Sequence, residues 1–441
     1  MMHDTIPSGE MLIDGRFRGA DKHREVINPA TGEAFAEVAM ADAAMTEEAI
    51  AAARRAQPAW GALAPLERAR YMRKVAAEIR GNAESYARLI VREQGKPINE
   101  ARGEVAGSAE FFDFFAEFAR RIQGEILPSD YAGEQIWIQR VPIGVVGAII
   151  PWNYPFALVA RKVAPALIAG DTIVLKSHED TPLSALAMAR IFHKVGIPAG
   201  VVNIITGTGP IVGEVLCASP ELDLITMTGS VPTGKRIMSN AAANLTPLSL
   251  ELGGKAPFIV MADSDIDIAV RSAVTSRYMN CGQVCICNER TYVERPVYDR
   301  FVEKFVAASQ ALRIGDPMDN GTDLGPKVSL RAGRQNCHWR QPPRKAAPCR
   351  RLLLQSDSHH RRASRDVHFE ERGLWARRAD YAFRQFRRGR SSRQRQPLWA
   401  VGISLHQRHH KDNACGERGC LRRTIRQSRW PGEPPGLPCR I

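Results

Sequence analysis

Short apolar runs alternate with helix-like segments from residue 143 onward, and this alternation limits the fold more than any other feature of the sequence. The runs "IGVVGAII", "TIVLK", "VVNII" and "DLITMT" predict strands, and the segments 156–169, 183–195, 210–218 and 234–243 predict the helices that follow them. Continuous apolar strands are typical of a parallel sheet covered by helices on both faces. Ligands usually bind at the loops after the carboxyl ends of such strands. The sequence therefore predicts an α/β fold with a binding edge.

The N-terminal part predicts a helical region over residues 46–122. Thr46 is expected to cap the first helix, and Pro65 to open a second one, "PLERARYMRKVAAEIRG", which ends at Gly81. The segment "LPSDYAGEQIWIQRVP" then alternates apolar and polar residues, which predicts an extended strand or hairpin. The helical spacing of apolar residues after Pro65 predicts one buried face, made of Ala69, Met72, Val75, Ala76 and Ile79.

The formal net charge of +14 suggests a nucleic-acid or membrane partner, but the charge is unevenly distributed. Residues 1–330 hold 34 Lys and Arg against 39 Asp and Glu, whereas residues 331–441 hold 27 against 8. Basicity belongs to the C-terminal segment alone, so we expect neither a nucleic-acid nor a membrane partner. The absence of a recognisable signal peptide or membrane span and the sparse cysteines of the body predict a soluble cytoplasmic protein.

Three cysteines lie close together in "NCGQVCICNER", and three interpretations of them are open. Cys281, Cys285 and Cys287 are ordinary buried thiols, or metal ligands, or one of them is a nucleophile. A metal site lacks a neighbouring His and a clear fourth ligand. A catalytic thiol needs an influence that deprotonates it, and it needs a base and an oxyanion donor from elsewhere in the chain.

Candidates for both partners follow predicted strands. Glu251 ends the strand in "LELGGK", before two glycines that let a backbone approach a ligand closely. Asn153 follows the first parallel strand, in "PWNYPF", and its side-chain amide is the type of donor that stabilises an oxyanion. Taken singly, Glu251 has the alternative interpretation of a surface or paired carboxylate, and Asn153 that of a turn residue.

Other loops predict a nucleotide site. "VLKSHEDTP" places Lys176 and Glu179, a cation and a carboxylate suited to ribose hydroxyls, after the second strand. "TGTGPIVG" ends at Gly213, and its GxGxxxG spacing is only loosely similar to a dinucleotide fingerprint. The loop "MTGSVPTG" places three candidates around a helix start, where backbone N–H groups suit a phosphate: Gly229, Ser230 and Gly234.

Together these motifs occur in an order that resembles the aldehyde dehydrogenase superfamily. They are PWN, LK..E.TP, TGS....G, LELGGK and GQ.C....R, and the resemblance runs from "MLIDGRF" to "DLGPKVS", about three-quarters of the chain. The wording "ARKVAPAL", "LELGGKAP" and "GQVCICNERTYV" looks most like bacterial lactaldehyde and glycolaldehyde dehydrogenases. The resemblance implies a Rossmann-like parallel-sheet cofactor domain and an α/β catalytic domain, which oxidise a small hydroxyaldehyde to the carboxylate.

The resemblance also assigns catalytic roles. Cys285 matches the family nucleophile, which forms a thiohemiacetal and then a thioester with the substrate. Glu251 matches the base that activates water to hydrolyse this thioester, and Asn153 with the backbone N–H of Cys285 matches the oxyanion hole. Arg161 is a guess for a substrate contact, with a surface role as the alternative.

For the cofactor, the resemblance implies NAD, and no metal is expected. Lys176 and Glu179 match contacts to the adenosine ribose, and a glutamate there favours NAD over NADP because a 2′-phosphate would meet its charge. Ser177 and His178 depart from the family, which usually has a proline after the lysine. The other residues matched to cofactor binding are Pro151, Trp152, Gly213, Gly229, Ser230, Gly234 and Leu252.

The resemblance predicts the domain boundaries. The cofactor domain covers 1–122 and 142–252, and an oligomerisation strand segment covers 123–141. An incomplete catalytic domain covers 253–330, and an Arg-rich tail covers 331–441. The family is homo-oligomeric, but its C-terminal assembly segment is missing here.

The tail is interpreted as the product of a shifted reading frame. Permitted codons for "DVHFEERGLWARRADYAFRQF", read one base later, spell "MSISRKEVFGPVAPITPFDSF", which resembles the missing part of the family. We infer a +1 slip between about Leu330 and Arg334, which leaves a non-native or disordered tail. The EVFGPV glutamate, which in the family holds the nicotinamide ribose, is then absent, and we expect this chain to be poorly active.

Two other functions remain open from the sequence. A CoA-acylating relative would transfer the acyl group to CoA instead of water, but the water-activating candidate Glu251 argues against it. A catalytically dead relic or a basic binding protein would use the Arg-rich tail, whose lack of helical or strand periodicity argues against a folded binding domain.

Overall fold

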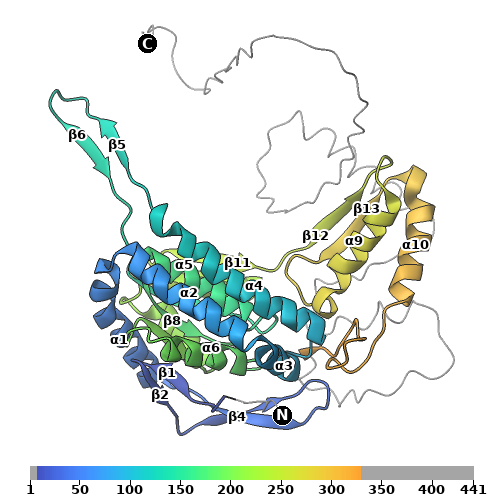
Figure 1. Cartoon of the computed structure of the whole chain (residues 1–441), viewed down its shortest axis with the longest axis horizontal. Helices are drawn as coiled ribbons and strands as arrows, with labels where there is room; N and C mark the ends of the chain where they lie inside the picture. The colour runs from blue at the N-terminus through green and yellow to red at the C-terminus, as the bar shows by residue number, and fades with distance from the viewer. Residues whose placement is uncertain (1–6, 329–441) are drawn as a thin grey trace. The chain divides into compact units, whose positions relative to one another are not determined.

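The computed structural model describes residues 7–328 of the chain (Figure 1). The predicted frame slip between about Leu330 and Arg334 and the Arg-rich, non-native tail of 331–441 lie outside these residues. Within the described part, none of the helices has the length and apolar character needed to cross a membrane.

A parallel sheet organises the fold, as the alternating pattern predicted. Among the described residues it has seven strands in the order β11-β10-β7-β8-β9-β1-β2. The five strands from β7 to β11 are parallel, and β1 joins β9 antiparallel. The strands are β1 (Met11–Ile13), β2 (Arg16–Arg18), β7 (Val145–Ile149), β8 (Thr172–Lys176), β9 (Val202–Ile205), β10 (Leu224–Gly229) and β11 (Leu248–Leu252).

Helices bury both faces of this sheet. Side chains of successive strand residues point to opposite faces, so Val146 and Ile173 join one hydrophobic cluster while Val145 and Val174 join another. The helices in the first cluster are α2 (Pro65–Gly81), α3 (Ala83–Gln94), α4 (Ile98–Ala116), α5 (Ala157–Ala169) and α6 (Leu183–Lys194). The second contains α1 (Ala43–Ala62), α7 (Glu214–Ala218) and α8 (Val231–Ala241). Burial on both faces explains why the strands are continuously apolar.

The helical N-terminal region is confirmed, with one error at its start. Asp42, not Thr46, caps α1: the Asp42 carboxylate accepts a hydrogen bond of 2.8 Å from the backbone N–H of Met45. Thr46 is buried inside the first turn, and its hydroxyl donates to the Asp42 carbonyl. Asp42 is already in place to satisfy the first free N–H groups, so the helix begins earlier than predicted. The Pro65 start, the Gly81 end and the predicted buried face of α2 are all confirmed.

The other boundaries differ only slightly from the prediction. The segment predicted as a helix over 210–218 is a π-helical turn, η2 (Gly209–Gly213), followed by the short α7. The helix predicted from 234 begins at Val231, because Ser230 caps it. The short 3₁₀ segments are η1 (Glu117–Arg120), η3 (Ala242–Asn244), η4 (Met279–Gly282) and η5 (Arg295–Val297).

Two antiparallel hairpins accompany the sheet. One pairs β3 (His23–Ile27) with β4 (Ala34–Ala39), and the other pairs β5 (Glu125–Pro128) with β6 (Gln135–Ile138). The second confirms the hairpin predicted from the alternating segment. All eight strand residues of this hairpin are exposed, including Trp137 and three isoleucines.

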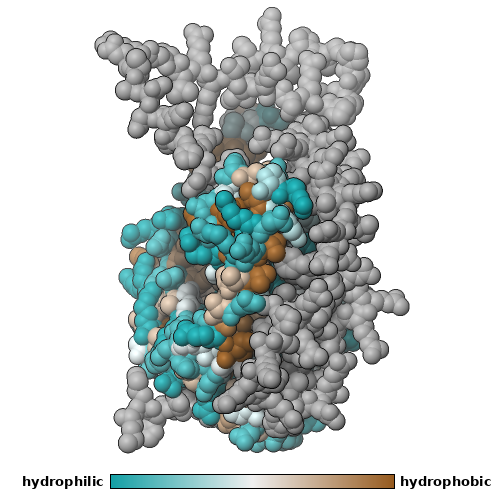
Figure 2. Space-filling model, turned by 90° about the vertical axis from the view of Figure 1, so that its right-hand side faces the viewer, coloured by the Kyte–Doolittle hydropathy of each residue, from teal (hydrophilic) through white to brown (hydrophobic). Residues whose placement is uncertain are grey.

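Residues after the sheet form a third hydrophobic cluster. The parallel strands β12 (Ala256–Val260) and β13 (Asn288–Val293) pack with α9 (Ile266–Tyr278) and α10 (Tyr298–Gln310). Figure 2, which views the molecule from the right-hand side of Figure 1, shows apolar side chains at the surface between hydrophilic ones. The exposed apolar residues of this segment include Ile259 and Ile286.

Glu93 ties α3 to the start of α6. Its two carboxylate oxygens accept hydrogen bonds of 2.8 Å from the backbone N–H groups of Leu183 and Ser184. The carboxyl group is buried, and this burial raises the pKa of Glu93 from 4.5 to about 8, although the hydrogen bonds from Ser184 and Leu183 act in the opposite direction.

We expect this carboxyl to make stability pH-dependent. Between pH 4.5 and about 8 the folded chain holds a proton that the unfolded chain has lost. The free energy of unfolding therefore decreases as the pH rises through this window, by at most about 1.4 kcal/mol per pH unit. Thermal unfolding of Glu93→Gln should lack this component, whereas Glu47→Gln, an exposed control on α1, should keep it. A melting-temperature difference between Glu93→Gln and the unaltered chain that stays constant from pH 5 to 8 would contradict the prediction.

Candidate active site

The carboxyl ends of four parallel strands bring the predicted residues to one edge of the sheet. In the strand register Ile149 of β7 lies beside Lys176 of β8 and Met227 of β10, and Gly229 lies beside Leu252 of β11. The chain runs from β7 through β8 to β9 on one side and returns to β10 and β11 on the other. Such a switch point opens a crevice between the two neighbouring strands, here β7 and β10. Asn153 follows β7 and Ser230 follows β10, so both border this crevice.

Lys176 and Glu179 lie together, as expected for a ribose contact. The Lys176 ammonium is buried, donates to the Ser177 carbonyl at 2.9 Å and lies 3.5 Å from a Glu179 carboxylate oxygen. Burial lowers the pKa of Lys176, while the charge of Glu179 raises it. Burial raises the pKa of Glu179, but Lys176, His178, a backbone hydrogen bond and Arg24 together lower it overall. The half-buried carboxylate is therefore an anion with free acceptor capacity, which suits sugar hydroxyls.

The start of α8 provides an anion-binding helix end. Ser230 caps this helix, and its hydroxyl accepts a hydrogen bond from the backbone N–H of Thr233 at 3.3 Å. A Cβ atom at Gly234 would lie 2.8 Å from Leu252 Cδ2, so a larger residue would displace this side chain, and glycine lets the helix approach β11 closely. In the first turn Pro232 carries no N–H group, and the N–H groups of Thr233 and Gly234 donate to Ser230. The Val231 N–H and the positive end of the helix dipole are therefore what this helix start offers to the phosphates of a dinucleotide. The structure thus brings Gly229, Ser230, Gly234 and Leu252 together.

In the glycine-rich loop after β9, the backbone requires glycine at position 207 and not at position 213. A Cβ atom at Gly213 would contact nothing within 4 Å, so packing does not require glycine at this position. Gly207, which has a φ of +153° and lies against Val212, is the glycine that the turn requires. The role of Gly213 in cofactor binding stays a prediction.

Pro151 and Trp152 lie half-buried in the loop after β7. The carbonyl of Trp152 accepts a hydrogen bond from the Thr181 hydroxyl at 3.3 Å, which joins this loop to the segment after β8. The backbone of Ile150 also donates to the Lys176 carbonyl at 3.2 Å. These bonds connect the predicted oxyanion loop with the predicted ribose contacts.

The three neighbouring cysteines occupy different environments. Cys281 donates to the Gly325 carbonyl at 3.2 Å, and burial raises the pKa of its thiol to about 11. Cys287 is half-buried and contacts the Arg277 guanidinium and the Gly282 carbonyl, both at 3.5 Å. Cys285 alone of the three is exposed, on the turn between η4 and β13. Its environment therefore fits a reagent-accessible nucleophile, and those of its neighbours fit structural thiols.

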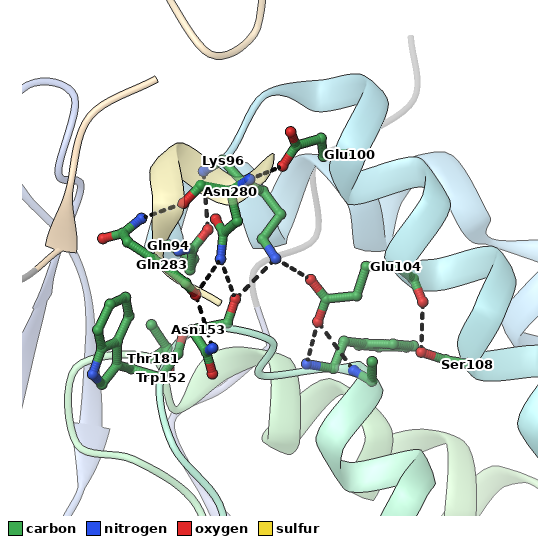
Figure 3. A network of polar contacts seen from close by, with 12 residues as sticks. Gln94, Lys96, Glu100, Glu104, Ser108, Trp152, Asn153, Thr181, Asn280 and Gln283 are labelled. Atoms are coloured by element: carbon green, nitrogen blue, oxygen red, sulfur yellow. Dashed lines mark hydrogen bonds and ion pairs between the residues drawn. The ribbon is translucent and has the colours of Figure 1, made fainter. Parts of the chain in front are cut away.

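Asn153 is directly connected to the cysteine loop. Its side-chain amide donates a hydrogen bond of 2.9 Å to the carbonyl of Gln283, two residues before Cys285. Tyr154 is also close: burial raises the pKa of Tyr154, and the charge of Cys285 acts in the same direction. Figure 3 shows this bond between Asn153 and Gln283. The predicted oxyanion donor therefore lies beside the loop that carries the predicted nucleophile.

Glu251 lies exposed near the end of β11, level with Thr228 of β10. Lys162, which sequence reasoning did not single out, lies close enough to interact with it. Burial lowers the pKa of Lys162 to about 8, and the charge of Glu251 acts in the opposite direction. The Lys162 ammonium donates to the Thr226 hydroxyl at 2.7 Å. A lysine inside an otherwise apolar helix, in "ARKVAPAL", was the signal that could have identified it.

Arg161 is exposed, with its guanidinium 5.0 Å from the Phe111 ring centroid. Its charge acts on the pKa of both Tyr154 and Lys162, so it lies near the candidate site. A substrate contact for Arg161 stays a prediction. Among residues 7–328, no group of His, Cys, Asp and Glu side chains is arranged to hold a metal ion.

Comparisons with known proteins identify the family. The sequence profile described as "Aldehyde dehydrogenase family" matches residues 17–345, slightly beyond the point where the motif resemblance ends. The chain belongs to the aldehyde dehydrogenase family, a family of oxidoreductases.

Similar proteins act on several aldehydes. The chain is 47% identical to 3,6-anhydro-alpha-L-galactose dehydrogenase of Vibrio sp. (strain EJY3) over 73% of this chain and 68% of that protein. It is 46% identical to lactaldehyde dehydrogenase of Escherichia coli (strain K12), over the same shares. A solved structure of 3,6-anhydro-L-galactose dehydrogenase in complex with NAP has a TM-score of 0.71 and 43% identity, over 73% of this chain and 68% of that one.

We expect iodoacetamide to alkylate Cys285 at least about tenfold faster than Cys281 near neutral pH, because Cys281 is buried with a raised pKa. All three cysteines lie in the tryptic peptide 278–290, so fragment-ion mass spectrometry at a series of times can assign each label. Equal labelling rates for Cys285 and Cys281 would contradict this description of the loop.

Proposed function

We propose that this chain oxidises a small hydroxyaldehyde, such as lactaldehyde or glycolaldehyde, to its carboxylate with NAD as the hydride acceptor. The hydrogen bond from the Asn153 amide to the Gln283 carbonyl carries the proposal, because it places an oxyanion donor beside the loop of the exposed Cys285. Similarity to lactaldehyde dehydrogenase supports a small hydroxyaldehyde as the substrate.

The proposed chemistry begins at Cys285. Its thiolate attacks the aldehyde carbonyl, and the carbonyl oxygen becomes an oxyanion that the Asn153 amide and the Cys285 backbone N–H stabilise. A bound NAD, which Lys176, Glu179 and Ser230 would hold, would supply the hydride acceptor; loss of hydride from this carbon leaves a thioester on Cys285. Glu251 takes a proton from water, the resulting hydroxide attacks the thioester, and the C–S bond breaks to release the carboxylate.

The exposed position of Glu251 supports its role as the group that accepts a proton from water. Glu251 lies at the exposed end of β11, where water can reach it. Lys162 lies within electrostatic range of Glu251: burial lowers the pKa of Lys162, and the charge of Glu251 acts in the opposite direction. The proton taken from water therefore arrives at a carboxylate that exchanges with solvent.

The proposal also covers the self-association, the cellular location and the level of activity of the chain. The exposed apolar hairpin of β5 and β6 supports self-association through residues 123–141. The sparse cysteines of the body support a cytoplasmic location. The alignments with the two relatives cover 73% of this chain and 68% of each relative, which supports a shifted frame after about residue 330 and poor activity of the chain as given.

A pre-steady-state assay with substrate in excess, which separates the first turnover from later ones, tests the function directly. Mixing the full chain with glycolaldehyde or lactaldehyde and NAD should give NADH. Cys285→Ala should reduce this rate at least about a thousandfold, because removal of a nucleophile disables the catalytic unit. Glu251→Gln should keep the first equivalent of NADH but slow later turnovers about 10²-fold, since only hydrolysis needs the base. Cys287→Ala, a neighbouring thiol, is the matched control.

Two results would contradict the proposal. NADH formation that survives Cys285→Ala would exclude this nucleophile. Turnover that requires added CoA would instead support the acylating type of aldehyde dehydrogenase.

The choice of cofactor depends on Glu179. We expect Glu179→Gln to raise the ratio of kcat/KM for NADP to that for NAD about tenfold, because the 2′-phosphate no longer meets a carboxylate. Asp180→Asn is the control, since the Asp180 carboxylate is paired with Arg24 at 2.6 Å. Equal effects of the two substitutions on the ratio would show that Glu179 does not select the cofactor.

A further inference from the structure

Two consecutive residues before Cys285 have backbone angles that non-glycine residues rarely adopt. Asn280 has a φ of +49° and Cys281 a φ of +57°, both in the left-handed region. Such angles persist only where neighbouring groups hold them. Asn280 is fully buried, so the groups that hold it can be identified from its contacts.

Glu100, in the first turn of α4, holds the backbone of Asn280. A Glu100 carboxylate oxygen accepts a hydrogen bond of 2.7 Å from the Asn280 N–H. The Asn280 amide in turn donates to the Asn153 carbonyl at 2.9 Å and approaches the Gln283 carbonyl at 3.4 Å. One carboxylate therefore fixes the residue that joins the cysteine loop to the Asn153 loop (Figure 3).

Lys96 and Glu104 also hold the Asn153 loop. The fully buried Lys96 ammonium donates to the Asn153 carbonyl at 2.9 Å and to a Glu104 carboxylate oxygen at 2.6 Å. It also lies 3.6 Å from the Tyr154 ring centroid. The other Glu104 oxygen accepts from the backbone N–H groups of Phe156 and Ala157 at 3.0 Å, at the start of α5.

These bonds form a network around Asn153. Lys96 and Asn280 share its carbonyl, and the Gln283 carbonyl accepts from its side-chain N–H. The Asn153 Oδ1 atom is buried without a hydrogen-bond partner among the described residues. Displacing the buried ion pair of Lys96 and Glu104 costs free energy, because it leaves a buried charge without its partner. The network therefore fixes the positions of the Asn153 loop and the cysteine loop relative to α4.

We propose that Glu100, Lys96 and Glu104 are positioning residues that set the Asn153 amide against the Cys285 loop for oxyanion stabilisation. This inference rests on the proposed function, in which Cys285 attacks a carbonyl. None of the three side chains touches the reacting atoms in this scheme; they act through Asn153 and Asn280. A displacement of the oxyanion donor by about 1 Å is enough to reduce the rate about 10²-fold.

Two reactions of Cys285 separate positioning from thiol reactivity, and neither needs NAD. With p-nitrophenyl acetate the thiolate attacks the ester carbonyl, an oxyanion forms, the C–O bond breaks and p-nitrophenolate leaves. With iodoacetamide the thiolate displaces iodide and no oxyanion forms. The ratio of the two second-order rates, each corrected with Cys285→Ala, therefore reports the oxyanion stabilisation alone.

Glu100→Ala should lower the ratio of acylation to alkylation about 10- to 100-fold. Glu100→Gln should restore it to within about threefold, because its amide oxygen can still accept from the Asn280 N–H. Glu110→Ala, an exposed control on the same helix, should leave the ratio unchanged. A general loss of stability in Glu100→Ala would not predict that Glu100→Gln restores the ratio of acylation to alkylation.

Asn280→Gly is a second substitution that tests the same network. Glycine tolerates the φ of +49° and keeps the backbone N–H for Glu100, but it loses the bond to the Asn153 carbonyl. Its ratio should fall like that of Glu100→Ala. If Glu100→Ala does not fold, as judged by circular dichroism, the ratio measured for Asn280→Gly tests the inference in its place: a fall supports the inference, and an unchanged ratio contradicts it.

The outcomes distinguish the inference from the function on which it rests. An unchanged ratio in folded Glu100→Ala or Asn280→Gly would overturn the inference alone, as would equal losses in Glu100→Ala and Glu100→Gln. Absence of any Cys285-dependent acylation in the unaltered chain would overturn the proposed function, and the inference with it.

Discussion

The structure depends on burial of both faces of one parallel sheet. Val145 and Val146 belong to different hydrophobic clusters although they are adjacent in the chain, so β7 packs on both of its faces. Burying apolar surface on both sides contributes roughly 25 cal/mol per Å², and it keeps most polar side chains out of the strand interiors, with Asn203 and Thr226 as buried exceptions. The candidate side chains therefore gather at the sheet edge, where Asn153, Lys176, Ser230 and Glu251 all lie.

This constraint also explains the charged residues that the fold does bury. Lys96 and Glu104 are fully enclosed, and each would lose several kcal/mol of hydration without a partner. They are tolerated because the backbone groups of the Asn153 loop and of α5 use their remaining hydrogen-bonding capacity. The buried charges of Lys96 and Glu104 therefore lie where two segments need a defined position.

Sequence patterns predicted the sheet, the α2 face and the strand-end candidates because these depend on neighbours along the chain. The order of motifs that placed Cys285, Glu251 and Asn153 was equally local. Thr46 was wrong because Asp42, four residues earlier, already met the same need for a cap. Glu100 was missed for a different reason: its partner Asn280 lies 180 residues away, and an acidic residue in the first turn of a helix has a sufficient local explanation.

The loop after β7 couples two parts of the molecule that engineering would treat as separate. The residues predicted to contact ribose follow β8, whereas the thiol lies on a turn between η4 and β13. The loop joins them, because Ile150 donates to the Lys176 carbonyl and the Asn153 amide donates to the Gln283 carbonyl. Effects of substitutions at sites that share partners need not add. Cofactor preference and carbonyl chemistry should therefore respond to selection as coupled traits, so that a library built at one site has to be screened again after changes at the other.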